Sequence, residues 1–210
     1  MEQFNTGLMP GYYSEALRII HRNFIFFLLL FIPMLIPWKY PYVFLALILI
    51  LRAGIYGGIA DLIRGRTKKL SFFASLKYHG FNFIFLALIL VLFFFSVVFL
   101  TEFGPFARQV FAGLMMVLAV YILPLCFLFH AILRPINAGL DFLVKNLRIS
   151  LPLLTLTAIL WGVQVMKLQV STPLRIALEA VCIYLELIVF SMATFVLSRN
   201  AYILERPEEE

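Results

Sequence analysis

The run from Tyr42 to Ile63, YVFLALILILRAGIYGGIADLI, decides the fold class of this chain. Its residues are apolar, aromatic or small except for Arg52 and Asp61. A helix needs ~20 mainly apolar residues to cross the ~30 Å of hydrocarbon in a bilayer. The run is continuously apolar, whereas the strands of a membrane barrel alternate between apolar and polar residues. The stretch is therefore predicted to be a membrane-spanning α-helix.

The composition of the whole chain agrees with this interpretation. Of the 210 residues, 63% are hydrophobic and 13% are charged, whereas about 25% of the residues in a soluble globular domain are charged. So few polar groups cannot cover the surface of a soluble enzyme, a nucleic-acid-binding module or a disordered regulator. We therefore expect an integral membrane protein that forms a single membrane domain over residues 1–210.

Six apolar runs are predicted to span the membrane. The first run is short by itself and reaches spanning length only if its helix begins near Leu17, with Arg18 and Arg22 extending to the membrane surface. Short turns alternate with longer connections, so the spans pair into three helical hairpins. The predicted fold class is an all-α polytopic membrane bundle of six transmembrane helices, with spans at Phe24–Trp38, Tyr42–Ile63, Phe81–Leu100, Val110–Leu133, Ile149–Met166 and Leu174–Leu197.

Basic residues gather on one side of the predicted membrane. Twelve lie on the side of the two termini and four lie on the opposite side, while Arg52 lies within a span. Cytoplasmic segments of membrane proteins carry an excess of Lys and Arg, so both termini are expected in the cytoplasm. The densest basic cluster follows the second span, and anionic lipid headgroups are expected to bind there, at Arg64, Arg66, Lys68 and Lys69.

Three segments with a shared pattern precede the odd-numbered spans. In each segment a small residue and a leucine are followed, after five further residues, by Asn23, Asn82 or Asn146. The pattern predicts three repeat units at 10–66, 70–136 and 137–203, followed by an acidic tail at 204–210. Each segment is expected to form an amphipathic cytoplasmic helix whose Asn satisfies backbone groups at the bend into the span. The alternative is convergence, because any hairpin protein needs a basic lead-in at each inner boundary.

Two opposite charges lie near the centre of the predicted bilayer. At a rise of 1.5 Å per residue, Arg52 and Glu186 lie roughly 15 Å and roughly 18 Å from the outer ends of their spans. Charges at this depth are costly, so the two side chains are expected to pair with each other. Glu179 lies on the same side of the last span, within reach of Arg175 or Lys167. The three residues Arg52, Glu186 and Glu179 are interpreted either as ion pairs that hold the bundle or as a transport site.

Small residues and a proline mark further positions in the spans. Gly54 and Gly58 form a GxxxG pattern with Gly57 between them, which lets another backbone approach closely. The pattern is interpreted as tight packing within the chain, and the alternative is a dimer seam or an unwound helix at a binding site. Pro124 is expected to kink the fourth span.

The sequence contains no motif for catalysis or metal binding. It has no Walker loop, no GxSxG and no dinucleotide-binding glycine pattern. His21, His79 and His130 lack metal-ligand spacing and are interpreted as residues of the membrane interface. Cys126 and Cys182 lie within apolar runs and are expected to be buried small hydrophobes. We therefore expect no enzyme activity, no cofactor and no metal.

Several short motifs spread over most of the chain carry a family resemblance: Asn23-Phe24, Asp61-Leu62-Ile63-Arg64-Gly65-Arg66, Phe72-Phe73-Ala74-Ser75-Leu76-Lys77, Asn82-Phe83 and Leu123-Pro124-Leu125. With these motifs the chain resembles the YesL-like (DUF624) bacterial membrane proteins. It is also similar to the membrane domain found beside glycerophosphodiester phosphodiesterases. The resemblance implies six spans, a bacterial plasma membrane and occasional association with sugar-transport systems, and it supplies no catalytic residues.

The expected function is that of a non-enzymatic accessory or scaffold subunit in a bacterial or archaeal plasma (inner) membrane. Its basic surface would bind anionic lipid headgroups, a partner membrane protein or a second copy of the chain, and no nucleic acid. The alternative is a small secondary transporter or channel that uses Arg52, Glu186 and Glu179. A membrane-embedded enzyme is the third hypothesis, because no nucleophile and base stand at a suitable spacing.

Overall fold

Every regular element of the described chain is helical, which confirms the predicted all-α class. The computed structural model describes residues 9–35, 40–100, 104–129, 134–167 and 170–199. The predicted acidic tail, Trp38 and His130 lie outside these residues. In chain order the elements are α1 (Met9–Arg22), α2 (Phe24–Leu28), η2 (Leu29–Leu35), α3 (Pro41–Ile63), α4 (Phe72–Leu100), α5 (Pro105–Phe129), α6 (Arg134–Lys145), α7 (Leu147–Lys167) and α8 (Thr172–Arg199).

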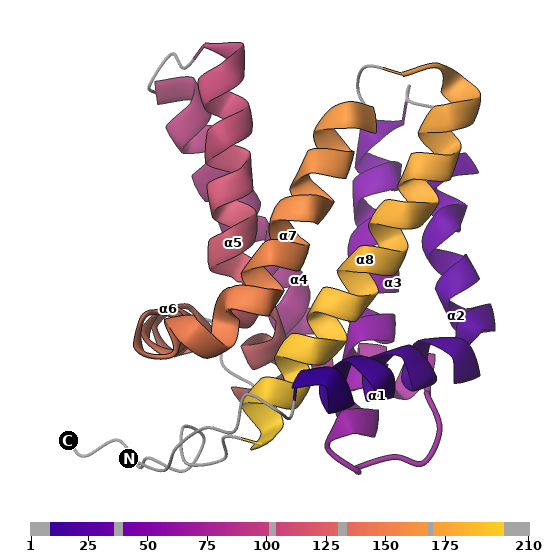
Figure 1. Cartoon of the computed structure of the whole chain (residues 1–210). Coiled ribbons are helices and arrows are strands. Elements are labelled where there is room, and N and C mark those ends of the chain that lie inside the picture. Colours follow the sequence, from indigo (N-terminus) through magenta and orange to yellow (C-terminus); the bar gives the residue numbers. More distant parts are fainter. Residues whose placement is uncertain (1–8, 36–39, 101–103, 130–133, 168–169, 200–210) are drawn as a thin grey trace.

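Five of these helices, α3, α4, α5, α7 and α8, are long and apolar enough to cross a membrane. They stand side by side as a bundle (Figure 1). The protein is therefore an integral, multi-pass membrane protein. The predicted first span differs from the others, because the chain bends by 78° between α1 and α2. The helix is therefore not continuous from Leu17, since α1 turns away from the direction of α2. If this bent pair forms one span, the described chain has the six predicted spans.

Asn side chains hold two of the bends. The Asn23 amide donates to the carbonyl of Ile19 at 2.9 Å, and the Asn146 amide donates to the carbonyl of Phe142 at 3.1 Å. The same two carbonyls also accept the backbone N–H of the Asn itself, so each Asn side chain adds a second hydrogen bond to the last turn of the helix that ends at the bend. Asn82 lies within the continuous helix α4, so the expected bend at this third position is wrong.

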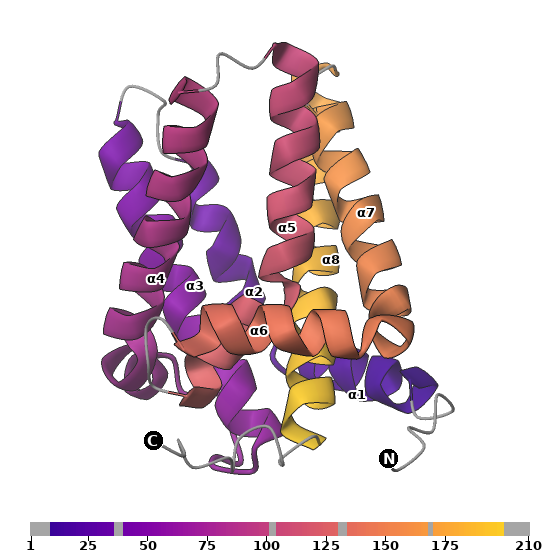
Figure 2. The same cartoon turned by 90° about the vertical axis from the view of Figure 1, so that its left-hand side faces the viewer.

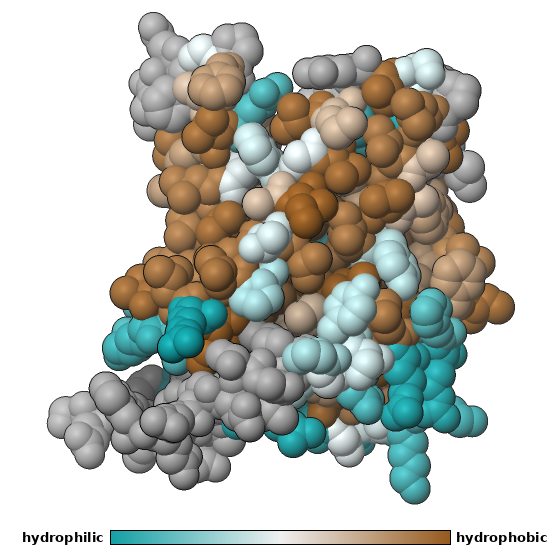
Figure 3. All heavy atoms as spheres, in the orientation of Figure 1, coloured by the Kyte–Doolittle hydropathy of each residue, from teal (hydrophilic) through white to brown (hydrophobic). Residues whose placement is uncertain are grey.

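Helices α1 and α6 run across the ends of the spanning helices at one end of the bundle (Figures 1 and 2). Both are amphipathic: α1 buries Ala16 and Ile20, and α6 buries Gly139 and Phe142. A Cβ at Gly139 would lie 3.0 Å from the backbone nitrogen of Ile122, so only glycine allows α6 to approach α5 this closely. We call this end, with α1, α6 and the connection 64–71, the basic end. Hydrophilic side chains gather there in Figure 3.

The packed core occupies only the half of the bundle next to the basic end. We call this part the core half; it contains residues 49–63, 72–86, 120–129, 147–160 and 182–199. The remaining parts of the spanning helices form the open half, at 42–48, 87–97, 106–119, 161–167 and 174–181. No described side chain of the open half is buried, whereas residues 53–61 of α3 are all buried. Toward the open half α5 moves away from α8 in Figure 1, and α3 and α4 move away from α5 in Figure 2. Helices α5 and α7 still meet there, because Trp161 donates to the carbonyl of Gln109 at 3.1 Å.

The glycines of α3 pack against the chain itself. A Cβ at Gly57 would lie 2.9 Å from the ring of His79, and a Cβ at Gly58 would lie 2.8 Å from the side chain of Leu70. At Gly54 a Cβ would collide with the ring of Phe72. The glycine face of α3 is therefore filled by residues 70–79, as the interpretation of tight internal packing requires, and it offers no surface for a dimer seam.

Candidate functional site

The structure brings Arg52 of α3 and Glu186 of α8 together at the boundary between the two halves. The guanidinium of Arg52 donates to the carboxylate of Glu186 at 2.7 Å. The Arg52 side chain is 37% exposed and the Glu186 side chain is 23% exposed, so the core does not seal the pair. The buried hydroxyl of Tyr56 lies beside both side chains and has no hydrogen-bond partner in the described part of the chain.

A second ion pair lies in the open half. Lys167, at the end of α7, donates to the carboxylate of Glu179 on α8. Glu179 lies seven residues before Glu186, so the two carboxylates share one side of α8. Each carboxylate meets one cation from a neighbouring helix. The two pairs link α8 to α3 and to α7.

A buried polar cluster that the sequence analysis missed joins α3 to α4. The Asp61 carboxylate accepts a hydrogen bond from the Ser75 hydroxyl at 3.2 Å and lies 3.2 Å from Nε2 of His79. His79 is only 1% exposed, so it is buried within the protein against Asp61, and its predicted depth at the membrane interface stays a prediction. The sequence did contain a signal for this cluster. Ser75 and His79 are four residues apart, so they share one face of a helix. Asp61, at the end of the preceding span, is a carboxylate that needs partners inside a membrane.

This cluster does not have the arrangement of a catalytic triad. In such a triad the histidine takes a proton from the serine, and the carboxylate orients the histidine. Here Ser75 and His79 both contact the same carboxylate, that of Asp61. The geometry fits a carboxylate that bridges two helices. The residues that the structure describes also contain no group of three His, Cys, Asp or Glu that could hold a metal ion.

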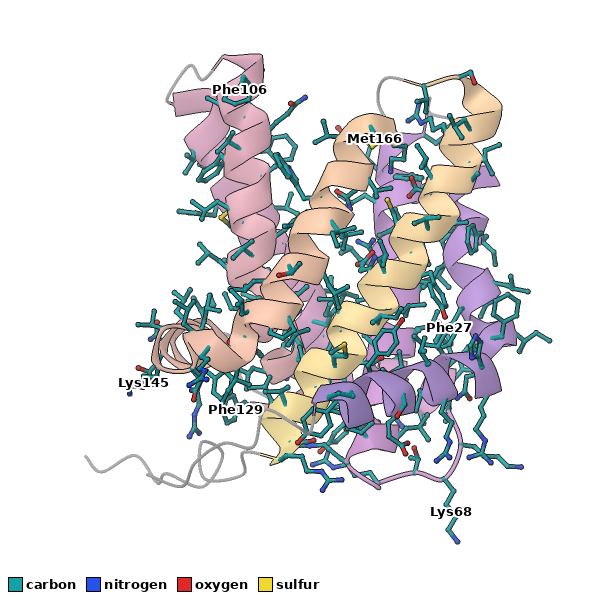
Figure 4. All side chains as sticks on the ribbon, viewed as in Figure 1. Phe27, Lys68, Phe106, Phe129, Lys145 and Met166 are labelled. Carbon is teal, nitrogen blue, oxygen red and sulfur yellow. The ribbon has the colours of Figure 1, made fainter. Side chains whose placement is uncertain are left out.

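The four cations of the predicted lipid-binding cluster divide into two kinds. Arg64 donates to the carbonyl of Leu128 at 3.0 Å, and Arg66 lies 3.8 Å from Asp61, so both contact the folded bundle. Burial, together with the nearby Arg66, lowers the pKa of the Arg64 guanidinium from its ordinary value. Lys68 and Lys69 are exposed, and Lys68 points away from the bundle in Figure 4. The lysines are therefore better placed than the arginines to meet a lipid headgroup.

Two further predictions concern single residues. Pro124 is buried within α5, which continues as one helix from Pro105 to Phe129, and the expected kink stays a prediction. Cys126 and Cys182 are buried and free, as expected for small core residues.

No protein-family profile, curated protein sequence or solved structure matches the chain. The resemblance to the YesL-like proteins therefore stays a prediction, and the function has to be argued from the geometry of the molecule.

Proposed function

We propose that the protein is a non-enzymatic accessory or scaffold subunit of a bacterial or archaeal plasma membrane. Its basic end would face the cytoplasm and bind anionic lipid headgroups, while its open half would receive a membrane helix of a partner complex. The observation that carries the proposal is the difference between the halves. The core half is packed and bears the basic residues, whereas the open half contains no buried side chain among its described residues.

The open half has the surface that a helical partner requires. Large apolar side chains such as Leu92, Phe106 and Leu114 are exposed there. Lipid tails are as apolar as these side chains, so helix association in a membrane depends on shape and van der Waals contact. Diverging helices leave apolar faces that a further helix can contact on more than one side.

The basic end has the chemistry of a surface that binds anionic membranes. Exposed Lys68, Lys69 and Lys145 surround amphipathic helices whose apolar faces are buried. Each cation adjacent to an anionic surface contributes on the order of 1 kcal/mol. Salt weakens this attraction, because the Debye length is only ~10 Å at 0.1 M ionic strength. Replacing Lys68 and Lys69 with Gln should weaken binding to anionic liposomes, and the difference from wild type should shrink as salt increases.

Affinity purification in a mild detergent tests the partner. We expect a stoichiometric membrane protein to accompany wild type and Leu151→Trp, a variant on an exposed face of the core half. The same partner should be lost from Leu114→Trp, in the open half, because the larger side chain disturbs the contact surface. Equal recovery of the partner with both variants, or purification of a homogeneous chain without any partner, would contradict the role assigned to the open half.

Orientation is tested by labelling of single cysteines in intact cells. Met166→Cys lies in the open half and Lys68→Cys at the basic end, as labelled in Figure 4. An impermeant thiol reagent should label Met166→Cys and leave Lys68→Cys unmodified until the cells are opened. Labelling of Lys68→Cys in intact cells would reverse the proposed orientation.

Transport is a second candidate function, favoured by the incomplete burial of the Arg52–Glu186 pair where the core half ends. A partly exposed polar pair within the membrane-spanning helices is a suitable place for a small solute or ion. Under this hypothesis, the double variant Arg52→Leu/Glu186→Leu should fold and lose solute flux in proteoliposomes. Under the accessory hypothesis it should fold and keep its partner.

A further inference from the structure

An apolar groove lies between the bent N-terminal helices and α8. It has a volume of about 390 Å³, within the roughly 300–1,000 Å³ that ligand pockets usually enclose. Ile20 of α1 and Phe27 of α2 line one side, and Val181 and Tyr184 of α8 line the other. Figure 4 shows Phe27 in this region, at the corner where α2 leaves α1. All lining residues are apolar or aromatic, so the groove suits a hydrocarbon chain.

One edge of the groove is basic. The last turn of α1 carries His21 and Arg22, both exposed. The ring of His21 lies 6.5 Å from the ring of Tyr184, which places this turn beside the groove. A helix C-terminus carries partial negative charge, which favours cations in its last turn. The groove therefore runs from an apolar wall within the bundle to a cationic edge at the basic end.

The bend at Asn23 creates this arrangement. Because α1 turns by 78° away from α2, its cationic last turn stands at the basic end while α2 and η2 continue as an apolar wall beside α8. A phospholipid has its charged and apolar parts in the same order, with a charged headgroup at the membrane surface and an acyl chain below it. Phe24 is 54% exposed although it lines the groove, so the groove is open toward the surroundings of the bundle.

We propose that the groove binds one acyl chain of an anionic phospholipid, whose phosphate is held by Arg22 and His21. This site rests on the proposed function in that the ligand is again an anionic lipid. It uses residues other than Lys68 and Lys69 and holds the chain as well as the headgroup. A lipid held in this way would brace the bent N-terminal segment against α8.

Native mass spectrometry of the full chain in detergent tests the site, with phosphatidylglycerol and phosphatidylcholine of equal chain length as probes. Ala180→Phe fills the groove, because Ala180 is one of its lining residues. Arg22→Gln removes the cation at the edge. Ala158→Phe makes the same substitution at an exposed position of α7 and serves as the control. Thermal unfolding without added lipid verifies that each variant is folded.

We expect wild type and Ala158→Phe to retain phosphatidylglycerol at least about tenfold more tightly than Ala180→Phe, a difference of ~1.4 kcal/mol. Arg22→Gln should lose the preference for phosphatidylglycerol over phosphatidylcholine and still retain lipid. Unchanged binding by a folded Ala180→Phe variant would overturn the groove as the site. Equal binding of the two lipids by wild type would overturn the role of the basic edge.

A Lys68→Gln/Lys69→Gln variant separates this inference from the proposed function. It should bind anionic liposomes more weakly and still retain the groove lipid. If it also loses the retained lipid, the lipid belongs to the basic cluster and the groove proposal is wrong. If liposome binding is unchanged while Ala180→Phe loses the retained lipid, the groove stands and the headgroup binding proposed for the cluster does not.

Discussion

The core half and the open half of the spanning helices are similarly apolar, yet among the described residues only the core half buries side chains. In α3, residues 42–48 are apolar or aromatic and none is buried, whereas all residues of 53–61 are buried. In α5, residues 106–119 contain no buried side chain and residues 124–128 are all buried. Hydropathy therefore explains why each helix enters the membrane, and it does not explain where the helices pack.

The two halves differ in small and polar residues. The core half contains Gly57 and Gly58, which let α3 approach residues 70–79, and Asp61, which bridges to α4. The open half of α4 contains the bulky run Leu92–Phe95 in place of such residues. In membranes, small residues permit close approach of helices and polar residues link them. The comparison indicates that these few side chains bring α3 and α4 together in the core half. In the open half a comparable close approach joins α5 to α7, where a Cβ at Gly113 would lie 3.0 Å from the ring of Trp161.

Removal of the Asp61 bridge should produce the largest loss of stability. In Asp61→Ala, Ser75 and His79 remain buried without this partner, which should cost ~3–5 kcal/mol. Reversible unfolding in mixed micelles measures the free energy. Asp141→Ala removes an exposed ion pair with Lys145 on α6 and should cost less than ~0.5 kcal/mol. Similar small losses in both variants would show that the bridge does not hold the core half together.

Truncation of one leucine in each half of α5 compares the halves directly. Leu125 is fully buried, so Leu125→Ala should cost ~2–4 kcal/mol through lost contacts and the cavity left behind. Leu114 is exposed, so Leu114→Ala should change the unfolding free energy by less than ~0.5 kcal/mol. The same unfolding assay measures both. If Leu114→Ala costs as much as Leu125→Ala, the open half is packed in the micelle.

The ion pair at the boundary should have an intermediate effect. Breaking a fully buried pair costs ~3–5 kcal/mol, and because Arg52 is partly exposed we expect ~2–3 kcal/mol for Arg52→Leu or Glu186→Leu alone. The double variant should lose less than either single variant, because no charge is left without its partner. A double-mutant cycle measures the coupling. If each single variant is as stable as wild type, both charges are in contact with water, and this result would favour the transport hypothesis.

Glycines with and without neighbours should give the smallest effects, with opposite signs. Gly57→Ala forces the His79 ring or the helix to shift and should destabilise the protein by ~1 kcal/mol. A Cβ at Gly162 of α7 meets nothing within 4 Å, so Gly162→Ala should stabilise it by ~0.5–1 kcal/mol through helix propensity. Thermal unfolding in detergent compares the two. Stabilisation by Gly57→Ala would show that α3 and α4 are not in close contact there.

The sequence was sufficient to predict the all-α class, the positions of the five spanning helices and the depth match of Arg52 and Glu186. These properties depend on the free energy of transferring each residue from water to hydrocarbon, and these free energies add up along the chain. The bends at Asn23 and Asn146 were also expected, because Asn satisfies backbone groups locally.

Only the tertiary structure decided which half of the bundle is packed. It also decided that α4 continues through Asn82, that His79 is buried against Asp61 and that Arg64 turns back to the carbonyl of Leu128. Each of these depends on residues far apart in the sequence whose shapes and polar atoms complement each other. In lipid, burying an apolar side chain against another helix gains little hydrophobic free energy, so complementarity of shape and polar atoms determines the packing. No local pattern in a single sequence encodes that complementarity.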